Sequence, residues 1–119
     1  MPRTVNGTGH NYASSLVKLE RFEEAKALLR RTIPVTLRVL RHSNHITLRM
    51  RKVYAKTLYL DSAATLHDLR EAVTTVEDLT RTARRVLGGA HPLTVEIEGR
   101  LRNARAALRA RETQSPRSN

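Results

Sequence analysis

Apolar residues recur along most of the chain at intervals of three and four residues, the spacing that places side chains on one side of an α-helix. Short polar or glycine-containing segments separate five such stretches. The pattern predicts an all-α fold whose helices run antiparallel because the connections are short. The predicted helices span residues 10–19, 22–40, 45–60, 66–87 and 92–111, with a flexible lead-in at 1–9 and a disordered polar tail at 112–119.

Residues suited to begin, end or bend helices stand near the predicted boundaries. Gly88 follows the fourth helix, where a left-handed C-cap favours glycine. Pro34 lies inside the second helix, and we expect a kink there without a break because the apolar spacing continues to Leu40. The candidate N-caps are Ser43 or Asn44 for the third helix and Thr65 or Asp68 for the fourth.

The chain also repeats itself. Glu24-Ala25 recurs 47 residues later as Glu71-Ala72, whereas Tyr12-Ala13 recurs 42 residues later as Tyr54-Ala55. The five-residue difference falls in the predicted loop at 61–65, where an insertion costs little free energy. A helical pattern repeated at this period is typical of a solenoid, which usually serves as a binding surface.

The repeat defines one domain at 10–111. Repeat 1 covers 10–40, repeat 2 covers 45–87, and 92–111 forms a half repeat or capping helix. Three or more repeats are usual for independent stability, so self-association through the end faces, or membership of a longer array, is an open alternative.

Two segments resemble a known family. Residues 12–29, YASSLVKLERFEEAKALL, resemble a tetratricopeptide repeat, with small residues at Ala13 and Ala25. Residues 87–94 fit the Leu-Gly-x-x-His-Pro-x-Thr connection of kinesin light chain-like proteins, whereas residues 40–47 fit it only at Leu and Thr, with Asn44 at the His position. The resemblance implies a short right-handed solenoid of helical hairpins with a scaffold or adaptor role. It also implies a concave groove lined by the first helix of each hairpin.

Composition narrows the possible functions. The chain has no cysteine, which excludes disulfides, thiolate catalysis and cysteine-based zinc sites. It has no apolar run of 18 residues, so we expect no membrane span, and a cytoplasmic location fits. The net charge of +11 favours acidic partners: an acidic protein or peptide, nucleic acid or an anionic membrane. Ordinary solvated helix faces are the alternative explanation of that charge.

The resemblance places a candidate peptide site on the concave face. Arg49, Lys52 and Lys56 share one side of the third helix with no acid among them, so they would attract a carboxylate-rich peptide. Tyr59 could supply an apolar anchor. The first helix would add His10, Ser14, Val17 and Lys18, and the third helix perhaps Leu60.

The fifth helix carries a second group of cations that could bind phosphate or lie on an anionic membrane. These residues do not all share one face, no aromatic side chain is interleaved for base stacking, and the apolar side is expected to be buried. Nucleic acid is therefore the weaker hypothesis. The group consists of Arg100, Arg102, Arg105, Arg109 and Arg111.

No other motif supports catalysis or cofactor binding. His42 and His45 lack a third metal ligand nearby, so no metal site is predicted. Residues 6–9 lack the lysine and the strand of a phosphate-binding loop. The sequence thus predicts a non-enzymatic protein–protein interaction scaffold without cofactor. The alternatives are a ligand-free segment of a longer array and a basic nucleic-acid-binding helical domain.

Overall fold

The computed structural model describes residues 8–114, which form five α-helices and, within that range, no strand. The all-α prediction is confirmed, and the predicted boundaries are met within a few residues. Helix α5 continues to Gln114, so residues 112–114, expected in the tail, are helical. The predictions for 1–7 and 115–119 lie outside the described residues. The helices are α1 (Thr8–Lys18), α2 (Phe22–Val39), α3 (His45–Leu60), α4 (Leu66–Val86) and α5 (Pro92–Gln114).

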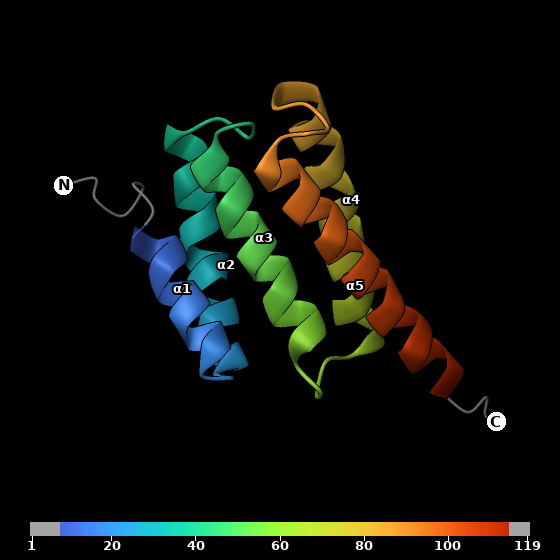
Figure 1. The fold of residues 1–119 in the computed structure, drawn as a ribbon. Helices are drawn as coiled ribbons and strands as arrows, with labels where there is room; N and C mark the ends of the chain where they lie inside the picture. Colours follow the sequence, from blue (N-terminus) through green and yellow to red (C-terminus); the bar gives the residue numbers. More distant parts are fainter. Residues whose placement is uncertain (1–7, 115–119) are drawn as a thin grey trace.

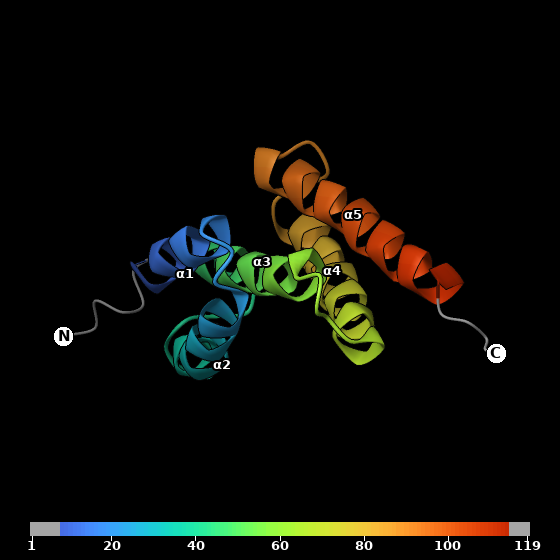
Figure 2. The same cartoon turned by 90° about the horizontal axis from the view of Figure 1, so that it is seen from below.

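The helices form two layers. Figure 2 shows α1, α3 and α5 in one layer, in the upper part of the view, and α2 and α4 in the other layer, below them in the view. Each helix packs against the next one in the chain, and α3 also contacts both α1 and α5 (Figure 1). Helix α3 is therefore the central element, and ten of its sixteen residues are buried.

Aliphatic side chains and alanines build the core. One cluster draws on all five helices, and a second joins α3, α4 and α5 around Leu48, Leu79 and Ile97. The paired small residues Ala13 and Ala25 are fully buried. Their small side chains let α1 and α2 approach closely.

The two connections between hairpins are capped in the same way by different residues. His91 Nδ1 accepts a hydrogen bond of 3.0 Å from the backbone N–H of Leu93. Asn44, 47 residues earlier, accepts one of 2.8 Å from the N–H of Ile46. The departure of residues 40–47 from the motif therefore changes the capping side chain but not the position of the cap.

The remaining helix ends use local chemistry. Thr65 and Asp68 together form a capping box at the start of α4. Gly88 has φ +91° and donates its N–H to the Arg84 carbonyl, a left-handed C-cap. Helix α2 continues through Pro34, as expected. At the α1–α2 turn, Glu20 adopts φ +61°, a left-handed conformation that its side chain disfavours.

Polar contacts connect the layers. The Tyr54 hydroxyl of α3 donates to Glu71 of α4 at 2.7 Å and accepts from Arg30 of α2 at 3.1 Å. Tyr12, at the matching position of α1, is 59% exposed because α1 has no earlier helix beside it in the described chain. The Arg111 guanidinium of α5 donates to the Ser62 and Ala64 carbonyls, so α5 holds the five-residue insertion.

Candidate functional site

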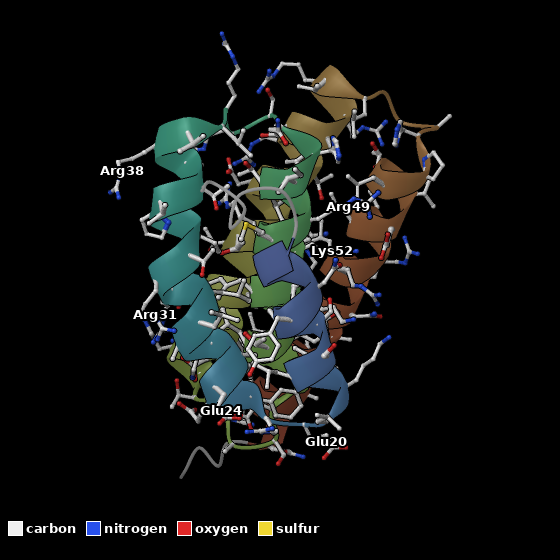
Figure 3. All side chains as sticks on the ribbon, turned by 90° about the vertical axis from the view of Figure 1, so that its left-hand side faces the viewer. Glu20, Glu24, Arg31, Arg38, Arg49 and Lys52 are labelled. Carbon is white, nitrogen blue, oxygen red and sulfur yellow. The ribbon has the colours of Figure 1, made fainter. Side chains whose placement is uncertain are left out.

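The candidate binding residues of α3 lie on the side of the molecule formed by α1, α3 and α5. Figure 3 shows Arg49 and Lys52 on the side of α3 that faces α5, whereas Arg31 and Arg38 point away from α2 on the opposite side. Arg49 and Lys52 therefore lie in the layer formed by α1, α3 and α5.

Lys52 is not a free cation, which corrects one prediction. Its side chain is 8% exposed, and its ammonium lies 2.5 Å from a Glu96 carboxylate oxygen of α5. Burial alone would raise the pKa of Glu96. The hydrogen bond and charge of Lys52, with the charges of Arg100 and Arg49, outweigh burial and hold that pKa below its usual value. Lys52 therefore joins α3 to α5 and offers no open charge to a ligand.

Lys56 lies in a partly buried, positively charged environment on this face. Burial lowers the pKa of Lys56, and the positive charges of Arg100, Lys52 and Lys18 lower it further. These neighbours come from α5, α3 and α1, so positive charges of three helices act on Lys56. Glu96 compensates them only in part, because it is already bonded to Lys52 and lies 3.7 Å from Arg100.

We call this surface the basic face and define it as Lys18, Arg49, Lys56 and Arg100 around the Lys52–Glu96 pair. Five cations and one carboxylate leave a positive surplus. The Nε atom of Arg100 is buried and has no hydrogen-bond partner in the described structure. The arrangement can bind a carboxylate or another anion through charge-assisted hydrogen bonds.

Tyr59 does not provide the expected apolar anchor. It is only 9% exposed, and its burial raises the pKa of its hydroxyl, so the ring belongs to the core. Its neighbour Leu60 is 47% exposed and lines a hollow of about 330 Å³ between the ends of α1 and α3, together with Val17, Lys18 and Phe22. Aliphatic contact is available there, one residue further along the chain.

The predicted residues of α1 have mixed outcomes. Lys18 is exposed in the last turn and contributes to the basic face. Ser14 is half-buried and Val17 is buried. The side chain of His10 lies outside the described part of the structure.

The arginines of α5 do not act as one array. Arg100 joins the basic face, Arg105 pairs with Glu77 of α4 at 3.1 Å, and Arg111 binds loop carbonyls. Arg102 and Arg109 are exposed and have no ion-pair partner within residues 8–114. The fifth helix therefore offers no continuous row of phosphate ligands.

Two residues of the basic face were missed from the sequence. Arg100 was assigned to the α5 group and Glu96 to no site. The sequence does contain a signal for Glu96: the 47-residue register matches Glu96 of the fifth helix to Arg49 of the third helix, so both lie on the equivalent face of their helices. The ion pair between α3 and α5 is not visible in the sequence, since it joins residues 44 positions apart.

Neither a metal site nor a membrane-spanning helix accompanies the basic face in the described residues. In the part of the chain that the structure describes, no three His, Cys, Asp or Glu side chains gather as metal ligands would. None of the helices there has the length and apolarity needed to span a membrane. No protein-family model, curated protein or solved structure matches this chain.

Proposed function

We propose that this chain is a tetratricopeptide-like interaction module that binds an acidic peptide on the basic face. The observation that carries the proposal is a set of cations on three successive first helices, in which the charges of Lys18 and Arg100 act on Lys56. Their mutual repulsion is relieved when a carboxylate binds between them, which gives the site a preference for anions. The surface is spread over three helices, as expected for an extended segment lying across a repeat array.

The repeat itself supports the tetratricopeptide-like part of the proposal. The first helices α1, α3 and α5 form one layer and the second helices α2 and α4 the other (Figure 2). Asn44 and His91 cap equivalent helix starts, and the following Thr47 and Thr94 are both fully buried. Two hairpin connections thus share register, cap and packing despite different sequences.

Some predicted residues have a different role in this proposal. Lys52 orients Glu96 and stays out of the contact with the peptide, whereas Lys18, Lys56 and Arg100 are the direct anion ligands. Leu60 takes the place of Tyr59 as an aliphatic contact, because its side chain is exposed beside Lys18. An acidic segment with aliphatic side chains satisfies both features.

The test measures the affinity of a labelled Glu-rich peptide by fluorescence anisotropy. Lys18→Gln combined with Lys56→Gln removes two charges from the basic face. The matched control, Arg31→Gln with Arg102→Gln, removes two exposed charges outside the basic face, so both double variants have the same net charge. We expect the first pair to weaken binding about tenfold or more and the control by less than about threefold.

Three results would contradict the proposal: no binding by the unmodified protein, equal weakening by both pairs, or no weakening by the first. Lys52 is left unchanged because it is bonded to Glu96 and offers no open charge to the peptide. Far-UV circular dichroism of each variant verifies that the helices are intact.

A further inference from the structure

The charge of the molecule is distributed unequally along the helix axes. Residues 38–48 and 84–95, which form the ends of α2 and α4 and the starts of α3 and α5, contain no acid. Acids gather at the other end, where Glu20, Glu24 and Asp61 line one hollow. Figure 3 shows Glu20 and Glu24 at one end of the molecule and Arg38 near the opposite end.

The acid-free end contains a hollow of about 570 Å³. Arg38, Arg41 and His42 line it from α2 and the following turn, and Arg85 closes it from α4. None of these three arginines forms an ion pair with any residue between 8 and 114. Unpaired guanidinium groups around one hollow match the oxygens of a phosphate group, to which they can donate two parallel hydrogen bonds each.

Exposed aliphatic side chains stand next to these arginines. Val39 is 61% exposed and Val86 is 43% exposed. The 47-residue register relates Arg38-Val39 to Arg85-Val86, so both hairpins present the same pair at this end. The helix dipole accounts for arginines in a last turn, but it does not account for two exposed valines beside them.

The combination distinguishes among phosphate-bearing partners. No Phe, Tyr or Trp lines the hollow, and His42 is its one ring, so a run of single-stranded bases has no row of aromatic side chains on which to stack. Arginines next to exposed aliphatic side chains suit the interface of an anionic bilayer, where phosphates and apolar groups lie within a few ångströms of each other. A membrane surface uses both features, whereas a soluble phosphate uses only the arginines.

We propose that this end of the protein docks on the surface of a bilayer that contains anionic phospholipids. Arg38, Arg41 and Arg85 bind lipid phosphates, and Val39 and Val86 enter the headgroup region. The docking surface shares no residue with the basic face, so a peptide and a membrane can be bound together. The failure of one proposal leaves the other intact.

The test is co-sedimentation with phosphatidylcholine vesicles prepared with and without phosphatidylserine. We expect binding only to the vesicles with phosphatidylserine. Each Arg near such a surface contributes about fivefold to affinity, so Arg38→Gln with Arg85→Gln should weaken binding about twenty- to thirtyfold. Val39→Ser with Val86→Ser keeps the charge and should weaken it severalfold. The equal-charge control, Arg31→Gln with Arg102→Gln, should stay within about threefold of the unmodified protein.

The other outcomes overturn the proposal. An equal loss of vesicle binding by the arginine pair and by its control would mean that the vesicles attract the protein through its net charge alone. Full binding by the valine pair would mean a phosphate site without membrane entry, and competition by soluble inorganic phosphate would then identify it. Absence of binding to vesicles with phosphatidylserine would remove the membrane altogether. Circular dichroism of the variants confirms that a loss of binding is not a loss of fold.

Discussion

The Lys52–Glu96 pair allows a quantitative test of how α5 is attached to the rest of the protein. The two side chains differ in burial, with Lys52 8% exposed and Glu96 40% exposed. Removing one partner of a fully buried pair costs about 3–5 kcal/mol. Because solvent screens the exposed carboxylate, we expect Glu96→Gln to cost less, about 2 kcal/mol, mainly from a buried ammonium left without its acid.

Substitution of Lys52 should reduce the stability less than substitution of Glu96. Lys52→Met keeps most of the apolar stem of the side chain and removes the buried charge. It leaves Glu96 partly solvated and 3.7 Å from Arg100, so we expect a cost below about 1 kcal/mol. The double variant should resemble Lys52→Met alone, because its glutamine no longer leaves a buried cation unpaired. Urea denaturation followed by circular dichroism measures the three free energies of unfolding.

The pH dependence supplies an independent check. The pKa of Glu96 is lowered in the folded state, so its contribution to stability is fully present above the usual carboxyl pKa of about 4.3. That contribution is lost as pH falls through the lowered folded pKa. The stability difference between the unmodified protein and Glu96→Gln should therefore be constant near neutrality and shrink below about pH 4.

The explanation is refuted if Lys52→Met costs as much as Glu96→Gln, or if the costs of the two single variants simply add in the double variant. Either result would mean that the pair is not coupled or that Lys52 is solvated. A difference that persists unchanged at about pH 3 would refute the assigned pKa direction.

Two further predictions concern the turns and caps. Glu20→Gly should stabilise the protein by a few tenths to about 1 kcal/mol, because glycine relieves the strain of the left-handed conformation but increases the entropy of the unfolded chain. The control Glu23→Gly, in the first turn of α2, should destabilise the protein in the same denaturation assay. A loss of stability with Glu20→Gly would show that residue 20 is not strained. Asn44→Ala should lower the free energy of unfolding by about 1 kcal/mol, because the cap of α3 is lost. Asn44→His should lose less, because His91 caps α5 at the equivalent position. Equal stability of the two variants in thermal melts would show that histidine cannot replace the asparagine cap.

The sequence by itself determined the helices and most of their ends. The apolar spacing that defines α3 and the caps at Asn44, Thr65 and Gly88 act over at most a few residues. Backbone hydrogen bonds and side-chain caps of this range depend only on neighbouring residues, so the sequence predicts them without knowledge of the rest of the fold. The 47-residue register, also a property of the sequence, related the two hairpin connections correctly.

Only the tertiary structure decided which charges are free. Lys52 and Lys56 lie on the same side of α3 in the sequence pattern, yet α5 supplies Glu96 to the first and Arg100 to the neighbourhood of the second. Tyr59 and Leu60 are adjacent, but only Leu60 remains exposed. Helical periodicity specifies the direction of a side chain. Whether that side chain meets solvent, an acid or another cation depends on residues more than forty positions away, because the packing of α5 against α3 brings them together.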